Sequence, residues 1–222
     1  IRKKLGRFSL VKRAEKSRLT LKLTALLKNT LDDSKNFPLI CVTGKMASGK
    51  NFVCSILEQM DFFAVDLDKE VHKVIVQKTD EIFNLFEKPA LQKNIKIRND
   101  DNTLNRRALG ELIFSDKQLL KKQEELIYPA LTEKVFSIIE NCKRKDIFKG
   151  MVLNAAVLFK TPQLLYECKM ILFVNSNFIK RFFRAKKRDK IKSMQILKRF
   201  YSQLFLKRKY KKTGIPVFNI HN

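Results

Sequence analysis

Residues 38–50 read PLICVTGKMASGK, an apolar run followed by a glycine-rich loop. The first five residues are continuously apolar, as in strands that are buried on both faces of a parallel sheet. The loop has the spacing G-x-x-x-x-G-K and leads into a helical pattern at Asn51. In such a strand-loop-helix context, the loop N–H groups and the positive end of the helix dipole bind phosphate. We therefore predict a phosphate-binding loop over residues 44–50.

Alternating strand and helix patterns predict the fold class. Further apolar runs lie at 62–65, 150–153, 170–174 and 216–220, and helical patterns at 50–60, 69–87, 104–114, 116–142, 176–187 and 190–211. This order predicts an α/β fold with a doubly wound parallel sheet. The segment at about 69–142 is too long for a simple crossover, so we expect a helical acceptor-binding subdomain over the carboxyl edge of the sheet, where ligands bind.

Composition limits the class of protein. With 222 residues and 45% apolar residues, the chain can bury one domain. Its formal charge of +25 is concentrated at both ends and suits nucleotides, nucleic acid or anionic lipid. Four cysteines without a C-x-x-C pair indicate neither a metal site nor a disulfide framework, and they fit a reducing cytosol. No apolar run approaches the ~20 residues of a membrane span, and we expect a cytoplasmic protein.

The first 37 residues are predicted to form a basic extension before the domain at 38–222. Leucines recur at helical spacing over 9–31 among Lys and Arg, and a polar linker follows at 32–36. Two interpretations stay open. The helix docks on RNA or a membrane surface, or it is a solvated extension that packs by one face.

Lys50 and Asn51 carry the expected nucleotide chemistry. Lys50 would reach the β and γ phosphates of ATP and stabilise the charge of phosphoryl transfer. Asn51 replaces the Ser or Thr that normally binds Mg²⁺, and an Asn carbonyl oxygen can also bind this ion. Alternatively, Asn51 only caps the helix while water carries the metal. The expected ATP-binding residues of this segment are Gly44, Lys45, Met46, Ala47, Ser48, Gly49, Lys50, Asn51 and Phe52.

Asp66 and Asp68 follow the second predicted strand and would face the phosphate loop. One carboxylate there can accept the proton of an acceptor hydroxyl, while the other orients it or binds Mg²⁺ through water. The structural alternative for Asp68 is a helix N-cap. Farther along, the basic segment at about 178–192 resembles a lid whose arginines close over ATP. Its alternative is a solvated basic face.

Several segments together resemble the dephospho-CoA kinase family, across nearly all of residues 38–222. The matching segments are TGKMASGK at 43–50, AVDLDK at 64–69, LNRRAL at 104–109 with IF at 113–114, YP at 128–129 in place of His-Pro, RD at 188–189 with Arg184, and VFNIHN at 217–222. Two segments depart from the family. Asn51 and Phe52 stand where it prefers Ser-Thr, and AVLFK at 156–160 replaces PLLFE, so that Lys160 reverses a charge.

The resemblance implies that the chain phosphorylates the 3′-hydroxyl of the ribose of dephospho-CoA with Mg-ATP, giving CoA and ADP. It implies Asp68 as the catalytic carboxylate beside Lys50, and Arg184 and Arg188 on the ATP phosphates. The expected acceptor-binding residues are Thr43, Asp66, Asp68 and Arg106.

Two rival functions stay open. A nucleoside or nucleotide kinase is favoured if residues 104–142 bind a free base. A nucleic-acid-binding protein on a degenerate P-loop fold is motivated by the charge and by Asn51. Salt-sensitive RNA binding without ATP turnover would support it.

Overall fold

The structure, a computed structural model, describes residues 2–31, 37–189 and 193–222. The polar linker predicted at 32–36 and the last residues of the expected lid lie outside these ranges. Among the described helices, none offers the length of apolar sequence that a bilayer crossing needs.

A five-stranded parallel sheet forms the centre of the molecule. Its strands are β1 (Leu39–Gly44), β2 (Phe62–Asp66), β3 (Gly150–Asn154), β4 (Cys168–Asn175) and β5 (Val217–His221), in the order β2-β3-β1-β4-β5. All four pairings are parallel, and every residue of β1 and β3 is buried. The predicted α/β class with a parallel sheet is confirmed. The β2–β3 register pairs Asp66 with Asn154, so these two polar residues meet where both strands end.

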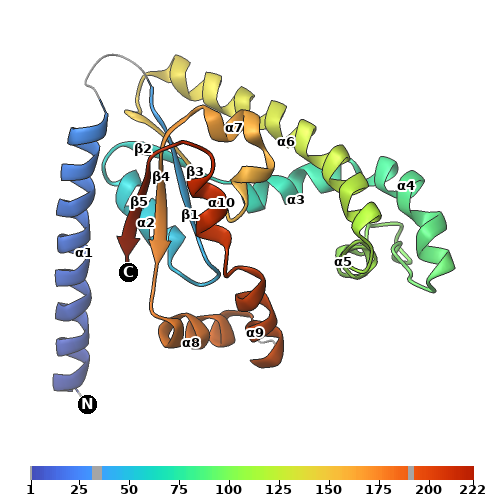
Figure 1. The fold of residues 1–222 in the computed structure, drawn as a ribbon, viewed down its shortest axis with the longest axis horizontal. Coiled ribbons are helices and arrows are strands. Elements are labelled where there is room, and N and C mark those ends of the chain that lie inside the picture. Colours follow the sequence, from blue (N-terminus) through green and yellow to red (C-terminus); the bar gives the residue numbers. More distant parts are fainter. Residues whose placement is uncertain (1, 32–36, 190–192) are drawn as a thin grey trace.

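One face of the sheet is covered by α1 (Arg2–Thr30) and α2 (Lys50–Glu58), as Figure 1 shows for the long blue helix beside the strands. Leu19, Leu23 and Leu27 of α1 share a core cluster with Ile40 and Val42 of β1. These leucines are four residues apart and therefore lie on one side of the helix, which turns that side onto the sheet. The observed helix begins well before the pattern at 9–31.

The other face carries α7 (Pro162–Tyr166), α10 (Leu206–Lys211) and the long helix α6 (Lys117–Lys145). Tyr210 of α10 is fully buried in this core. Its hydroxyl accepts a hydrogen bond from the Leu158 N–H at 2.8 Å and donates to the Ala156 carbonyl at 3.3 Å. The short 3₁₀ helix Leu158–Lys160 and α7 were not predicted from the sequence.

Two predicted helices are each divided in two. The helix expected at 69–87 forms α3 (Leu67–Gln77) and α4 (Thr79–Gln92), separated at Lys78, whose N–H bonds to the Val74 carbonyl. The helix expected at 190–211 is replaced by α9 (Ser193–Ser202) and α10. Neither break contains Gly or Pro, so the sequence carries no local signal for it. In Figure 1, α6 leads away from the sheet to α4 and α5 (Arg106–Phe114).

The remaining helix, α8 (Phe178–Asp189), follows β4 and packs on α9 beyond the carboxyl ends of the strands (Figure 1). A small core joins them to the phosphate loop: Ala185, Ile196 and Phe200, with Met46 and Ala47 packed against them. A hollow of about 1230 Å³ lies at the opposite edge, beside the end of α1 and the first residues of β1 and β2. Since ligands of parallel sheets bind at the carboxyl edge, that hollow is not the candidate active site.

Candidate active site

The glycines of the loop are required by space and by backbone conformation. A Cβ on Gly44 would lie 2.4 Å from the Val174 carbonyl oxygen. Gly49 has a φ of +97°, and a Cβ there would lie 1.8 Å from the side-chain nitrogen of Asn222. Neither position can accept a side chain without a shift. The loop therefore passes closely beneath β4 and the last residue of the chain, and it leads directly into α2.

Asn222, which follows β5, contacts the loop directly. The Asn222 side-chain amide donates to the Ser48 carbonyl at 3.0 Å, and its backbone N–H bonds to the Asn175 carbonyl. Ser48 is buried, and its hydroxyl has no partner among the described residues. Phe52, one turn into α2, packs partly buried against the core beneath the loop. These contacts hold the loop from both sides.

Lys50 is the first residue of α2 and lies among charges from three elements. Burial lowers the pKa of Lys50; the negative charge of Asp68 opposes this shift, and the positive charge of Arg188 adds to it. The phosphate loop, the segment after β2 and the basic helix α8 thus converge on one ammonium group. This is a cationic site with a carboxylate opposite, which suits a transferred phosphoryl group and its acceptor.

Asp66 and Asp68 have different structural positions. Asp66 is the N-cap of α3, and its carboxylate accepts from the Lys69 N–H at 3.4 Å. The alternative that Asp68 is the cap is therefore wrong, because Asp66 occupies that position and Asp68 lies in the first turn. Asp68 stays accessible to solvent at the site's margin. Partial desolvation raises the pKa of Asp68, Lys50 opposes the rise, and Asp66 adds to it.

Asn51 bonds to a residue that the sequence reasoning missed. Its side-chain oxygen accepts from the Asn154 amide at 3.0 Å, and Asn154 ends β3. The N-cap of α2 is Gly49, so the alternative that Asn51 caps this helix is wrong. The other polar atom of Asn154, Oδ1, is buried without a hydrogen bond among the described residues. A polar residue at the carboxyl end of an otherwise apolar strand was the signal that could have identified Asn154.

The basic helices α8 and α9 are attached to the loop through Met46. Arg181 is buried, its Nε donates to the Met46 carbonyl at 2.9 Å, and its guanidinium lies 4.1 Å from the Phe200 ring centroid. On the other side of Met46, its N–H donates to the Gln203 side chain at 2.6 Å. Burial lowers the pKa of the neighbouring Lys45, and the charge of Arg181 lowers it further. Gln203, like Asn154, was not singled out from the sequence.

Arg184 and Arg188 lie on the loop side of α8. Arg184 Nη1 donates to the Ser176 hydroxyl at 3.3 Å and would lie 3.6 Å from a Cβ on Gly49. Arg188 forms an ion pair with Asp189 at 2.6 Å, which raises the pKa of Arg188. The structure therefore brings both predicted arginines to the margin of the phosphate loop.

Two expected acceptor residues are not in this group. Thr43 is fully buried beneath the site, where its hydroxyl donates to the Ala156 carbonyl at 3.3 Å. Arg106 is exposed at the start of α5, and among the described residues no hydrogen bond, ion pair or charge effect joins it to Lys50 or Asp68.

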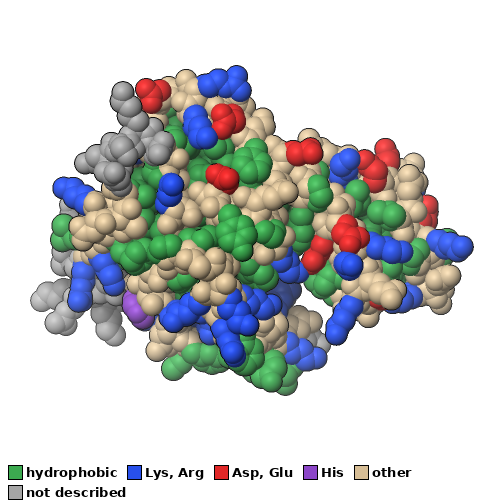
Figure 2. All heavy atoms as spheres, turned by 45° about the horizontal axis from the view of Figure 1, so that its top comes forward, with side chains coloured by type: hydrophobic (Ala, Val, Ile, Leu, Met, Phe, Trp, Pro, Cys, Tyr) green, Lys and Arg blue, Asp and Glu red, His purple; other side chains and the backbone are tan. Residues whose placement is uncertain are grey.

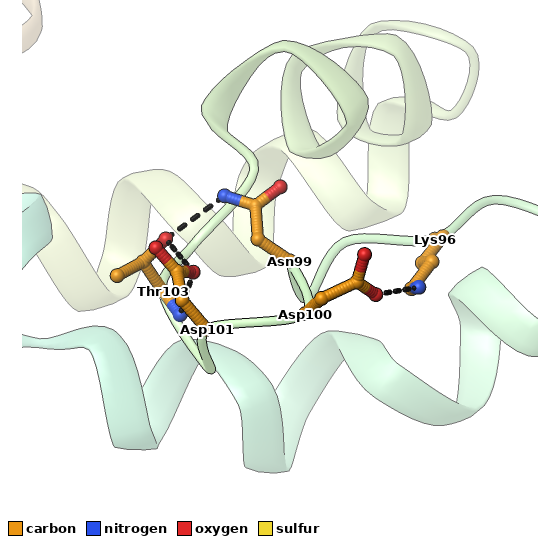
Figure 3. Close-up of polar contacts among 5 residues, drawn as sticks. All are labelled: Lys96, Asn99, Asp100, Asp101 and Thr103. Carbon is orange, nitrogen blue, oxygen red and sulfur yellow. Dashed lines mark hydrogen bonds and ion pairs between the residues drawn. The ribbon is translucent and has the colours of Figure 1, made fainter.

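The loop before α5 fixes where that helix begins. Asp101 accepts from the N–H and the hydroxyl of Thr103, and Asn99 donates to the same hydroxyl at 2.9 Å (Figure 3). Lys96 pairs with Asp100 on the outside of the turn (Figure 3). Asn105 then caps α5 by accepting from the Ala108 N–H at 3.1 Å. The local sequence thus holds Arg106 at the first position of its helix.

The helix α6 supplies two further polar residues, Tyr128 and Glu124. Burial raises the pKa of Tyr128 to about 12, and the charges of Glu124 and Asp68 add to the rise, so the phenol faces both carboxylates. Glu124 forms an ion pair with Lys160, both partly buried. The reversed charge at Lys160 is therefore balanced within the chain, and it also connects α6 to the segment after β3.

Comparison with known proteins gives one family. The family model for dephospho-CoA kinase matches residues 38–221. The dephospho-CoA kinase of Treponema denticola is 35% identical over 184 residues, covering 80% of this chain and 82% of that protein. The Treponema pallidum enzyme of the same name is 32% identical over 166 residues, covering 75% and 78%.

Solved structures show the same fold. A Thermus thermophilus protein superposes with a TM-score of 0.68 at 24% identity, covering 85% of this chain and 90% of that chain. Dephospho-CoA kinase from Campylobacter jejuni superposes with a TM-score of 0.58 at 20% identity, covering 83% and 88%.

Proposed function

Because this chain belongs to the dephospho-CoA kinase family, we propose that it binds ATP and dephospho-CoA side by side at the carboxyl edge of the sheet, near Lys50 and Asp68. The reaction is transfer of the γ-phosphoryl group to the 3′-hydroxyl of the ribose, the final step of CoA synthesis. The supporting observation is the mutual influence of the Lys50, Asp68 and Arg188 charges at the carboxyl edge of the sheet. It supports a site in which a cation binds phosphate and a carboxylate accepts the proton of a hydroxyl.

On the ATP side, the loop N–H groups and Lys50 would hold the β and γ phosphates. Arg184 and Arg188 would add positive charge where negative charge develops on the transferred group. Arg181 and Gln203 would serve a different purpose. By bonding to the carbonyl and the N–H of Met46, respectively, they would hold α8 in a fixed position beside the loop.

On the acceptor side, Asp68 would accept the proton of the 3′-hydroxyl as its oxygen attacks the γ-phosphorus. The bond from that phosphorus to the β–γ bridging oxygen breaks, and ADP leaves. Partial desolvation raises the pKa of Asp68, and a carboxylate with a raised pKa is a stronger base than an ordinary one. Arg106 would hold the acceptor from α5. Tyr128 of α6 would line the path by which the acceptor enters the site.

Magnesium fits the residues present. The described part of the chain holds no cluster of three or more His, Cys, Asp or Glu side chains suited to a metal. Mg²⁺ bound with a nucleotide needs few protein ligands, because phosphates and waters complete its shell. Asn51 would supply one oxygen, oriented by Asn154, and Asp66 or Asp68 would act through water. The ion would neutralise charge on the β and γ phosphate oxygens.

Release of ADP with dephospho-CoA, compared with nucleoside monophosphates as acceptors, tests the proposal. Dephospho-CoA should be the preferred acceptor, and Asp68→Asn should lower kcat by about 10²–10⁴-fold, the usual contribution of a general base. Asp61→Asn is the matched control, since Asp61 pairs with Lys149 at the opposite edge. Equal turnover of a nucleoside monophosphate would refute the acceptor, and an active Asp68→Asn variant would refute the base. The four cysteines are free and buried, and we propose the cytoplasm as the location.

A further inference from the structure

Exposed hydrophobic side chains are concentrated on α8, α9 and the turn after them. Of the sixteen large hydrophobic residues that are exposed in the described part of the chain, eight fall within residues 178–205. They are Phe178, Ile179, Phe183, Met194, Leu197, Tyr201, Leu204 and Phe205. Single exposed hydrophobic residues are normal, but a concentration in so short a segment marks an interaction surface. We call this set the exposed apolar surface.

Helical spacing places these residues on the outer sides of both helices. In α8 the buried residues Arg181 and Ala185 face the loop, whereas Ile179 and Phe183, also four residues apart, lie on a different side. Met194, Leu197 and Tyr201 repeat at i, i+3 and i+7 along α9, away from its buried residues. Two stripes that would suit a protein core therefore face solvent.

Positive charge surrounds these stripes. Residues 178–222 hold 15 Lys or Arg against Asp189 alone. On α8, Lys180, Lys186 and Lys187 are exposed next to Ile179 and Phe183. Figure 2 shows hydrophobic side chains at the lower end of the molecule, where α8 and α9 lie, beside a broad group of Lys and Arg. An apolar stripe bordered by lysines is typical of helices that lie in the interface of an anionic membrane.

Charge and side-chain type decide between the candidate occupants. A second copy of this chain that docked through the same surface would bring together like charges, because residues 178–222 hold 15 Lys or Arg against Asp189 alone. Single-stranded RNA would match the charge, but its bases stack on aromatic rings and leave Ile179, Met194, Leu197 and Leu204 exposed. An anionic bilayer takes up both the aliphatic groups and the lysines.

We propose that the exposed apolar surface docks peripherally on an anionic lipid bilayer, with Ile179 and Phe183 of α8 and the Met194–Leu197–Tyr201 stripe of α9 entering the headgroup region. Docking leaves the catalytic side free. Arg184 and Arg188 lie on the loop side of α8, and Arg181 still bonds to Met46 beneath it. A membrane-bound protein would thus keep its phosphate loop open to nucleotide.

Flotation of the full chain with vesicles tests this proposal. Vesicles of phosphatidylcholine with phosphatidylglycerol should carry the protein, vesicles of phosphatidylcholine alone should not, and binding should weaken with salt. Replacing both Lys186 and Lys187 with Gln should lower partitioning by roughly 30-fold, since each charge near the surface contributes on the order of a fivefold effect. The matched control replaces the exposed Lys88 and Lys122 with Gln and should retain binding.

The apolar contribution is tested separately. Ile179→Ser with Phe183→Ser should abolish flotation, whereas Leu91→Ser with Phe114→Ser, equally exposed but on α4 and α5, should retain it. Thermal unfolding of each variant verifies that it is folded. Because the chain has no tryptophan, Phe183→Trp adds a single reporter whose emission should shift to the blue with anionic vesicles, unlike that of Phe114→Trp.

Three results would overturn the proposal. Equal binding to uncharged vesicles would remove the role of the lysines. Unchanged flotation of the Ile179 and Phe183 double variant would remove the role of the apolar surface. Binding of single-stranded RNA through the same residues, without vesicle binding, would assign the surface to nucleic acid instead.

Discussion

Replacing Leu23 with alanine should lower the free energy of unfolding by about 2–5 kcal/mol. Leu23 lies on α1, is fully buried, and belongs to the same core cluster as Ile40, Val53 and Leu172. The change removes buried methyl and methylene groups and leaves a cavity against the sheet, which close-packed neighbours fill only in part. With a loss of about 3 kcal/mol, the melting temperature should fall by about 6–12 °C in a domain of this size.

Urea unfolding measures this loss, and α1 provides its own control. Leu21, two residues earlier, is 71% exposed, so Leu21→Ala should change stability by less than about 0.5 kcal/mol. Both substitutions remove the same atoms from the same helix and alter helix propensity equally. The difference between the two midpoints therefore reports burial against the sheet.

Equal midpoints for the two variants, with an unchanged dependence on urea, would refute this reasoning. They would mean that α1 leaves the sheet at little cost before the rest of the protein unfolds. The basic N-terminal extension would then be a separate, weakly attached helix. A large difference would instead make α1 a layer of the folded domain, although the family match begins at residue 38.

Three further predictions concern the core and the site. Tyr210→Phe should cost about 1–3 kcal/mol in urea unfolding, because the buried Leu158 N–H loses its acceptor; an unchanged midpoint would show that another group replaces it. On acidification, kcat/KM should fall at a pH above the usual pKa of an Asp, because the base must be ionised and the pKa of Asp68 is raised. A fall only at or below that usual pKa would contradict this. The same shift means that the folded state holds the Asp68 proton more tightly than the unfolded chain does. The free energy of unfolding therefore falls as pH rises from the unfolded-state pKa of Asp68 through its folded-state pKa. Asp68→Asn should accordingly raise the melting temperature at pH 7. Gly49→Ala should abolish ATP binding in calorimetry, since its Cβ would meet Asn222 and its φ is positive; binding within threefold of the original would show that the loop tolerates a side chain.

Local sequence was sufficient where the physical signal is local. The five strands were predictable because continuous apolar runs suit strands covered on both faces, and each observed strand overlaps its prediction. The phosphate loop was predictable because glycine at 44 and 49 is demanded by the backbone itself. The break between α3 and α4 at Lys78 was missed because no Gly or Pro marks it. The two helices part there to pack separately against the rest of the core.

The amino-acid pattern established the fold class, the phosphate loop and the chemical types available at the site, since these depend on periodicity and short-range spacing. Tertiary structure alone decided which side chains meet. Asn154 bonds to Asn51, 103 residues away in the sequence, and Gln203 bonds to Met46, 157 residues away. Lys160 pairs with Glu124 of α6. It also distinguished Asp66, the helix cap, from Asp68, which faces Lys50. These assignments depend on how strands and helices are brought together in space, and no short-range pattern encodes that distance.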